Sequence, residues 1–433
     1  MNASTPDAAV EIHPTLRRAP APDEIIERAG ALAAAHPGLA RLSVIGRSRA
    51  GEPLRVLSVG EGEHRVLVTA GAHSNEQVGG ATVLELAGLL AGRPELLSGT
   101  AWDFVLCLDP DASRLADAGP ARETGLASVF EGFYRAAGEE QPEWAPSFGV
   151  RMPESDALLR LVRERRPYLQ VSLHGVDVGG TFIQTTKAVP GLGAAFAASA
   201  RRTGIPVESA SYDAFFWDSD GPGVFVLPPA DRRNRFEANI EDARTSTWYA
   251  PHAYGGRTLI VEVPEWTDER FADPTPLDDG PEALRATAAF LRSRTRTVTA
   301  LLKEAEPHAA AGPFLRAITT PLGVSHPLAD EWDPKGRRDR HGALNHMTRA
   351  RQASLETIAH RLPIRISALL ARALEGPGKE RERLRSRAIG LVHQWCDEFA
   401  SVFALRAVPF ADQVAHQGAT VLAAARLTAP DGV

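Results

Sequence analysis

His73 and Glu76 form a His-x-x-Glu pair shortly after an apolar run, Val66-Leu67-Val68. An imidazole and a carboxylate at this spacing can close on one metal ion, and Zn²⁺ accepts both ligand types. The pair alone is a weak motif, because it recurs by chance in many chains. The alternative is a helix N-terminus, with His73 at the cap and Glu76 near the positive end of the dipole. Two ligands do not hold a catalytic zinc ion, so a third ligand and a general base are needed.

His174 is the candidate for the third ligand. It ends a second apolar segment, residues 168–173, and small residues including Gly175 follow it. A histidine from a distant strand end would complete an open site whose fourth position is left for water, which is typical of catalytic zinc. Without His73 and Glu76, a lone His174 would more often be a buried histidine with satisfied hydrogen bonds.

Glu262 is the candidate general base. It lies in Thr258-Leu-Ile-Val-Glu262-Val-Pro264, whose apolar and β-branched residues predict a buried strand. A carboxylate in such a strand is costly unless it is paired or functional. Near a metal-activated water it could accept a proton and pass it to a leaving amine. The alternatives are a structural glutamate paired with arginine, and Glu265 as a rival for either role.

The chain resembles the M14 zinc carboxypeptidases at three motifs in the family's order: His73-Ser-Asn-Glu76, Ser172-Leu-His174 and Leu259-Ile-Val-Glu262-Val-Pro. Between the first two, Asp109-Pro-Asp-Ala112 resembles the family's Asn-Pro-Asp-Gly turn, and residues 153–159 resemble the start of the helix before the last ligand strand. The resemblance covers roughly residues 22 to 300. It implies one Zn²⁺ per chain, held by His73, Glu76 and His174, with Glu262 as the catalytic base.

The implied fold is an α/β three-layer sandwich around a mixed, mostly parallel sheet, with the site at the strand ends. The residue pattern agrees with this fold class. Apolar segments predict strands at 53–59, 65–70, 102–108, 168–173, 181–186 and 258–263, and helical patterns lie at 23–35, 77–92, 154–166 and 190–203.

The resemblance also implies an arginine that holds the carboxylate of the substrate, because a guanidinium grips a carboxylate through two parallel hydrogen bonds. The candidates are Arg114, Arg122 and Arg135. Arg135 is the first choice, since Gly132-Phe-Tyr134-Arg135 resembles the place of the family's anchor, and Tyr134 is grouped with it as substrate-binding. Arg114 is assigned to stabilising the oxyanion. The alternative for each is an ordinary surface arginine.

Two departures from the family favour a specialised substrate. Asp109-Pro-Asp-Ala112 has an acid in place of the amide and has lost the glycine, so its charge and backbone differ. The family's loop tyrosine is missing from its usual distance before the base. Tyr254, followed by two glycines, is the candidate donor to the substrate, and a packed tyrosine on a turn is the alternative.

Composition restricts the classes of function. The chain has 433 residues, 44% hydrophobic and 24% charged, which suits a globular protein of one or, more readily, two domains. A net charge of −6 argues against a nucleic-acid partner. No signal peptide or membrane-spanning run is predicted, and two distant cysteines do not indicate a disulfide framework. A cytoplasmic protein is the simplest expectation.

The predicted organisation is an N-terminal tail at 1–21, a zinc carboxypeptidase-like catalytic domain at 22–305 and a helical region at 306–433. The helix from about 282 to 302 is taken as the last of the catalytic domain. Further helical patterns lie at 347–374, 378–405 and 410–425. These helices could cover the mouth of the site or mediate formation of a homo-oligomer.

The sequence therefore predicts a zinc-dependent hydrolase of an amide bond. The first hypothesis is a metallocarboxypeptidase that removes a C-terminal residue from a peptide or peptide-like substrate. The second is an intracellular amidase or deacylase of a small N-acyl amino acid or biosynthetic intermediate. The third is a scaffold that retains zinc without catalysis.

Overall fold

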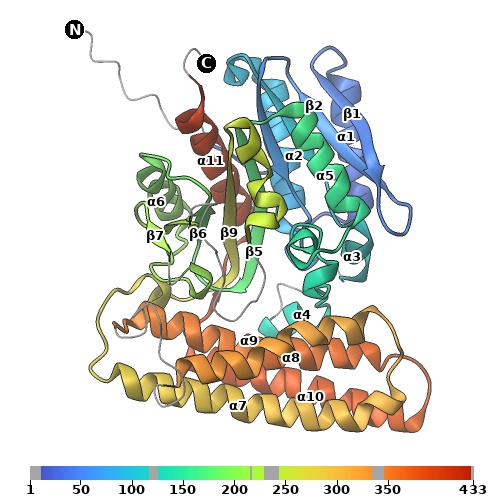
Figure 1. The fold of residues 1–433 in the computed structure, drawn as a ribbon, viewed down its shortest axis with the longest axis vertical. Helices are drawn as coiled ribbons and strands as arrows, with labels where there is room; N and C mark the ends of the chain where they lie inside the picture. The colour runs from blue at the N-terminus through green and yellow to red at the C-terminus, as the bar shows by residue number, and fades with distance from the viewer. Residues whose placement is uncertain (1–10, 117–124, 215–216, 229–242, 334–345, 431–433) are drawn as a thin grey trace.

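The computed structural model describes residues 11–116, 125–214, 217–228, 243–333 and 346–430. One mixed sheet forms the centre of the chain (Figure 1), in the order β1-β2-β4-β3-β5-β9-β6-β8-β7, with β10 paired to β9. Its strands are β1 (Ala40–Arg47), β2 (Pro53–Val59), β3 (His64–Thr69), β4 (Thr100–Val105), β5 (Leu169–Val178), β6 (Phe182–Thr185), β7 (Asp218–Ser219), β8 (Val224–Val226), β9 (Arg257–Thr267) and β10 (Arg406–Ala407).

Parallel pairing runs through β4, β3, β5 and β9 and recurs between β6 and β8. The other described pairings are antiparallel. The predicted α/β class with a mixed sheet is confirmed, but the parallel part is its centre rather than most of its width. The short connection from β1 to β2 makes this pair antiparallel, because only a long crossover can join parallel neighbours.

Strand β3 shows why the central strands are apolar throughout. Val66 and Val68 join the core cluster shared with α2 (Val78–Gly92), whereas Leu67 joins the cluster on the other face with α5 (Pro153–Arg165). Side chains alternate between faces, so a strand covered by helices on both faces is apolar at successive positions. The three layers expected from the sequence are therefore present.

Eleven α-helices are present in the described residues, and four of them lie together at one end of the sheet (Figure 1). Those four are α7 (Gly280–Ala305), α8 (Pro313–Trp332), α9 (Arg349–Ala373) and α10 (Lys379–Val402). The others are α1 (Pro22–Ala35), α2, α3 (Pro110–Leu115), α4 (Leu126–Glu131), α5, α6 (Leu192–Thr203) and α11 (Phe410–Thr428).

The helices divide differently from the predicted boundary at 305/306. Helix α7 packs on α8 and α9, so it belongs to the helical bundle rather than to the sheet. Helix α11 returns to the sheet and packs on α2, α6 and β9, although it comes last in the chain. The described end of the N-terminal tail also packs there, since Ile12 and Leu16 are buried against core clusters of the α/β part. Amphipathic periodicity predicts that a helix has a buried face but not what covers that face.

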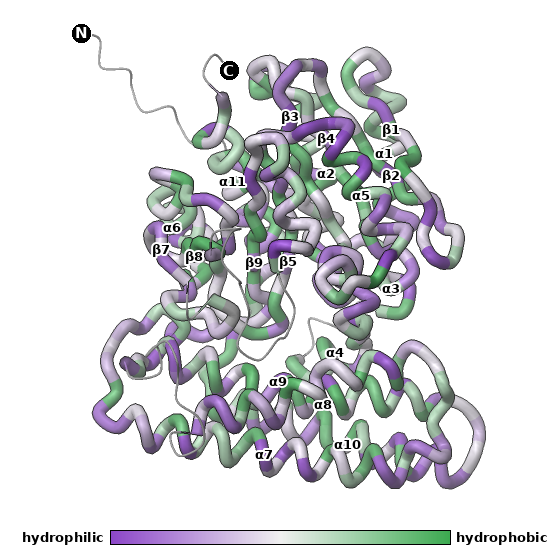
Figure 2. The backbone as a smooth tube through the Cα atoms, in the orientation of Figure 1, coloured by the Kyte–Doolittle hydropathy of each residue, from purple (hydrophilic) through white to green (hydrophobic). Residues whose placement is uncertain are grey.

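Figure 2 shows the hydropathy of the chain along the same backbone, with hydrophobic residues concentrated in the central strands. In the bundle, hydrophobic and hydrophilic residues alternate along each helix, as expected for helices with one buried face. Of the helices in the described residues, none is both long and apolar enough to cross a lipid bilayer. Self-association through the bundle stays a prediction.

Candidate metal centre

His73 and Glu76 lie in the turn that connects β3 to α2. The turn is closed by a hydrogen bond from the Glu76 amide to the His73 carbonyl, 3.2 Å long. It brings His73 Nδ1 to 3.0 Å from Glu76 Oε2, with both side chains buried. The turn begins at Gly71, whose positive φ of 65° and close approach to Cys107 leave no room for a side chain. The two residues thus face each other because the backbone turns sharply after the strand.

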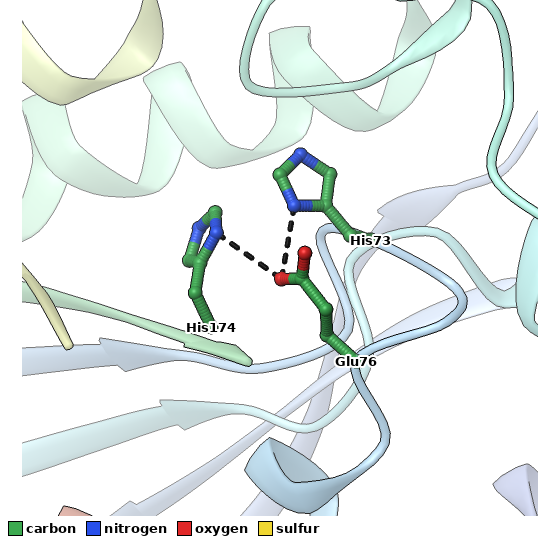
Figure 3. Close-up of side chains that lie close together, drawn as sticks. All are labelled: His73, Glu76 and His174. Atoms are coloured by element: carbon green, nitrogen blue, oxygen red, sulfur yellow. Dashed lines mark hydrogen bonds and ion pairs between the residues drawn. The ribbon is translucent and has the colours of Figure 1, made fainter. Parts of the chain in front are cut away.

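His174 reaches the same point from the neighbouring strand β5. Its Nδ1 lies 3.2 Å from Glu76 Oε2, and Figure 3 shows both imidazoles directed at this carboxylate. Ligands about 2.0–2.1 Å from a tetrahedral ion lie about 3.3 Å from one another. One ligand atom from each of His73, Glu76 and His174 lies within 4.8 Å of the others. Two nitrogens and one oxygen at these separations fit Zn²⁺ with one position left open.

Glu143 contacts the ring nitrogen of His174 that is farther from Glu76. No sequence pattern predicted Glu143 as a site residue. Its Oε2 lies 2.9 Å from His174 Nε2 and accepts a 2.9 Å hydrogen bond from Trp248 Nε1. Its Oε1 accepts a 2.5 Å hydrogen bond from Ser172 Oγ. A carboxylate on the far nitrogen fixes the orientation of a ligand histidine and increases its basicity. Glu143 lies between two short 3₁₀ turns without a motif, so no local signal identifies it.

The pKa values in the cluster reflect dense pairing of opposite charges. Burial, followed by the positive charge of Arg135, lowers the pKa of His73 to about 4. Burial also acts to lower the pKa of His174, but Glu76 and Glu143 outweigh it and raise that pKa well above its ordinary value. Conversely, burial acts to raise the pKa of Glu76, and the surrounding histidines and Arg135 hold it well below its usual range. The pKa of Glu143 is also lowered, mainly by His174 acting against burial.

Glu262 lies beside the cluster, on β9. The parallel register of β5 and β9 pairs His174 with Glu262, so the two side chains point the same way. Glu262 Oε1 lies 3.5 Å from His174 Nδ1, the side that faces Glu76. Glu262 also lines the cavity in front of the cluster, and Glu265 does not. The geometry therefore selects Glu262 over its rival.

Arg135 lies in the site, but not at a distance that suits an anchor for the far end of a substrate. Its Nη1 donates to Glu76 Oε1 at 2.8 Å, and its Nη2 lies 3.1 Å from His73 Nε2. These contacts place the charge of Arg135 beside His73 and Glu76, and its role as a substrate anchor stays a prediction.

The other predicted substrate residues are not brought to the cluster. Arg114 donates to Glu52 and Asp23 on the surface, at 3.0 and 2.8 Å, and does not line the cavity. Tyr134 is buried edge-on against Phe314, with ring centroids 5.3 Å apart, and burial raises its pKa to about 12.

Tyr254 is 38% exposed at the end of a 3₁₀ helix (Thr247–Tyr254), beneath the guanidinium of Arg166. It is therefore the packed turn tyrosine of the alternative interpretation. The tyrosine that lines the cavity is Tyr212 instead. Arg122 lies outside the described residues.

The altered Asp109-Pro-Asp-Ala112 turn has a structural role. Asp109 caps α3 by accepting from the Ala112 amide at 3.0 Å, and both its oxygens accept from Arg49 at 3.0 Å. Asp111 accepts from Ser48 Oγ at 2.6 Å and thereby fixes the loop between β1 and β2. Burial raises the pKa of Asp109 to about 6.

A cavity of about 270 Å³ opens in front of the cluster. One side carries residues of the α/β part, including the predicted ligands, Glu262, Trp144 and Trp248. The opposite side is built by α8 and α9, which contribute Pro321, Val324, Leu328, Ile358, Arg361, Leu362, Arg365 and Leu369. The bundle thus forms one wall of the cavity. Arg361 and Arg365 line this wall, and no sequence motif predicted them.

Comparison with known proteins bears on the predicted resemblance. Residues 25–117 match the sequence model of the zinc carboxypeptidase family, Peptidase M14. This segment contains His73 and Glu76, so the predicted family resemblance is confirmed there. His174 and Glu262 lie beyond the matched segment and join the site through the sheet. No curated protein matches the chain.

Among solved structures, a metallo-carboxypeptidase from Burkholderia cenocepacia is 18% identical, with a TM-score of 0.38 over 56% of this chain and 60% of that one. A carboxypeptidase A from Helicoverpa armigera is 14% identical, with a TM-score of 0.38 over 57% of this chain and 64% of that one. The chain thus spans about three fifths of the length of the bacterial structure.

Proposed function

Starting from the resemblance of residues 25–117 to zinc carboxypeptidases, we propose that the chain is a zinc-dependent hydrolase that cleaves an amide bond. The observation that carries the proposal is the convergence of His73, Glu76 and His174, with Glu262 beside them, on a cavity large enough for a small substrate. Three ligands with an open position are typical of catalytic rather than structural zinc.

Zn²⁺ bound by this ligand set would polarise the substrate carbonyl and make a water molecule easier to deprotonate. Glu262 accepts the proton of that water, because its carboxylate borders the ligand cluster and lines the cavity. The same carboxyl group then gives the proton to the nitrogen of the departing amine. Glu143 keeps His174 oriented throughout, through the hydrogen bond at Nε2.

Arg135 is the side chain placed to stabilise negative charge on the carbonyl oxygen. Its guanidinium borders the ligands and lines the cavity, whereas Arg114 does neither. If His73 held zinc through Nδ1, its proton would lie on Nε2, and the Nη2 of Arg135 would no longer have an acceptor there and would be available to the substrate. A preorganised donor beside a developing oxyanion contributes about 3 kcal/mol to lowering the barrier.

The substrate that we propose first is a peptide or peptide-like molecule from which a C-terminal residue is removed. The size of the cavity gives the second hypothesis, deacylation of a small N-acyl amino acid, a specific basis. The bundle closes one side of the cavity, which has a volume of about 270 Å³, and a wall on this side favours a small substrate.

Substitution of Glu262 by Gln tests the reaction. The variant keeps a side chain of the same shape but cannot accept the proton, so we expect bound zinc to be retained and turnover to fall at least about 100-fold. Zinc is measured by elemental analysis, and turnover by mass spectrometry on C-terminal peptides and N-acyl amino acids. Glu265→Gln, three residues further along the same strand, is the control and should stay active.

The substrate panel separates the hypotheses. Trimming of peptides supports the carboxypeptidase, and hydrolysis of acyl amino acids alone supports the deacylase. Full activity of Glu262→Gln would remove this residue from the mechanism. Stoichiometric zinc without hydrolysis of any member of the panel would favour a scaffold that retains the metal.

A further inference from the structure

Helix α9 presents one face to the cavity, and this face carries two arginines. Its cavity-lining residues are Ile358, Arg361, Leu362, Arg365 and Leu369, which the helical period places on one side. A face that packs over a site between two parts of a protein is usually apolar. The arginines are therefore exceptional positions in an otherwise apolar wall.

Asp177 fixes both guanidinium groups through a single oxygen. Its Oδ2 accepts from Arg361 Nε at 3.2 Å and from Arg365 Nε and Nη2 at 2.9 and 2.6 Å. Asp177 lies on β5, three residues after the ligand His174. The strand that supplies a metal ligand thus also orients the arginines of the bundle.

Several donors of the two arginines remain available after these contacts. In the part of the chain that the structure describes, the Nη atoms of Arg361 and Nη1 of Arg365 have no hydrogen-bond acceptor. Both side chains are largely buried, 11% and 12% exposed, and both line the cavity. Guanidinium donors held in this way are preorganised for a planar anion.

The charges around the pair leave room for such an anion. Arg361 and Arg365 share the carboxylate of Asp177. Burial, and next the positive charge of Arg361, lowers the pKa of Arg365 to about 10. Arg135 adds a further positive charge nearby. Glu208 borders Arg361 in a small adjoining pocket, where its Oε2 accepts from the Gly180 amide at 3.0 Å. A buried cation that shares its counter-charge is stabilised when an anion binds.

We infer that Arg361 and Arg365 bind a carboxylate of the substrate, so that the helical bundle rather than the strand ends selects the substrate. This inference rests on the proposed function, because it names the substrate class of the same site. A carboxylate matches the fork of a guanidinium, and the apolar residues on either side of the pair suit an uncharged side chain next to it.

Binding of a product-like probe tests the inference without turnover. The probes are N-acetylphenylalanine and its C-terminal amide, which differ only in the carboxylate, and affinity is measured by calorimetry on the zinc-loaded chain. We expect the acid to bind roughly 10- to 100-fold more tightly than the amide. In Arg361→Gln this preference should largely vanish, with affinity for the amide unchanged.

Two further variants guard against a folding defect. Arg361→Lys keeps the charge and can keep its pairing with Asp177, and should lose part of the preference because an ammonium lacks the fork. Arg349→Gln, an exposed arginine on the same helix, should keep all of it. Circular dichroism and zinc content confirm that each variant is folded.

The outcomes separate this inference from the proposed function. Equal affinity of the unsubstituted chain for acid and amide, absence of binding included, would overturn the inference. So would an undiminished preference in folded Arg361→Gln. Either result could coexist with loss of hydrolysis in Glu262→Gln, in which case the hydrolase assignment stands and only the source of specificity changes.

Discussion

The two sides of the cavity are built in different ways. On the side of the sheet, a turn after β3 and the middle of β5 provide the proposed metal ligands, so these groups come from short segments with recognisable local patterns. On the side of the bundle, Arg361 and Arg365 come from a helix nearly two hundred residues further along the chain. The difference suggests that chemistry and selectivity are encoded separately, the first by motifs and the second by packing.

Asp177 is one of the contacts that join the two sides, and its substitution should have the largest effect. In Asp177→Asn two buried arginines lose their shared carboxylate, which we expect to lower the free energy of unfolding by about 3–5 kcal/mol. Urea denaturation measures the change. Asp330→Asn removes an exposed partner of Arg292 in the bundle and should cost less than about 1 kcal/mol.

If Asp177→Asn also costs less than about 1 kcal/mol, the shared carboxylate contributes little to holding the arginines of α9 against β5. That result would show that Asp177 does not couple the two sides of the cavity energetically.

Glu143 tests the side of the cavity that the sheet forms, because it orients His174. Glu143→Gln weakens the hydrogen bond that orients His174, and we expect zinc affinity to fall about 10- to 100-fold, equivalent to about 1.4–2.7 kcal/mol. Competition with a chelator measures the affinity. Glu140→Gln removes a partner of Arg316 in the same segment and should leave zinc binding unchanged. Equal affinities for both variants would exclude an orienting role for Glu143.

His416 on α11 provides a smaller test, in a helix that follows the bundle in sequence but packs on the sheet. Thr181 Oγ1 donates its proton to the Glu262 carbonyl at 2.6 Å, so His416 Nε2 donates to Thr181 and Nδ1 accepts from Ser199. The hydrogen bond that Nδ1 accepts requires a neutral imidazole, because a protonated ring has no acceptor nitrogen. Burial accordingly lowers the pKa of His416 to about 3.

The folded state therefore binds no proton at His416 where the unfolded state, with a pKa near 6.5, begins to bind one. Stability from this residue is present above about pH 6.5 and is lost as the pH falls. Between pH 7 and pH 6 the loss is about 0.7 kcal/mol. We expect His416→Gln to reduce the pH dependence of urea denaturation by this amount. An unchanged pH dependence would show that the imidazole is not held neutral.

Most of the elements that position the site were predictable. The predicted strand at 53–59 matches β2, and the one at 65–70 nearly matches β3. The predicted helices at 23–35 and 77–92 correspond to α1 and α2. These segments have strong periodicity or continuous apolar runs, which is where sequence patterns are most informative. Weakly patterned strands such as β1, whose burial is irregular, were missed.

Of the site, the ligand cluster and Glu262 were predictable and the substrate residues were not. His73 and Glu76 have a recognisable spacing after an apolar run, and His174 follows a second apolar run, although it lies in the middle of β5 rather than at its end. Arg114 and Tyr254 were chosen from their neighbours in sequence, and the structure places both on the surface. Glu143 and Arg361 have ordinary local contexts, so nothing in the sequence distinguishes them from structural residues.

The sequence by itself determined which groups could bind a metal and accept a proton, because ligand chemistry is a property of residue type and close spacing. It also determined the apolar strands that carry them. Only the tertiary structure decided that α7 joins the bundle, that α11 returns to the sheet and that α9 closes the cavity with two arginines. Such contacts depend on which buried faces meet, and a periodic pattern specifies a face without specifying its partner.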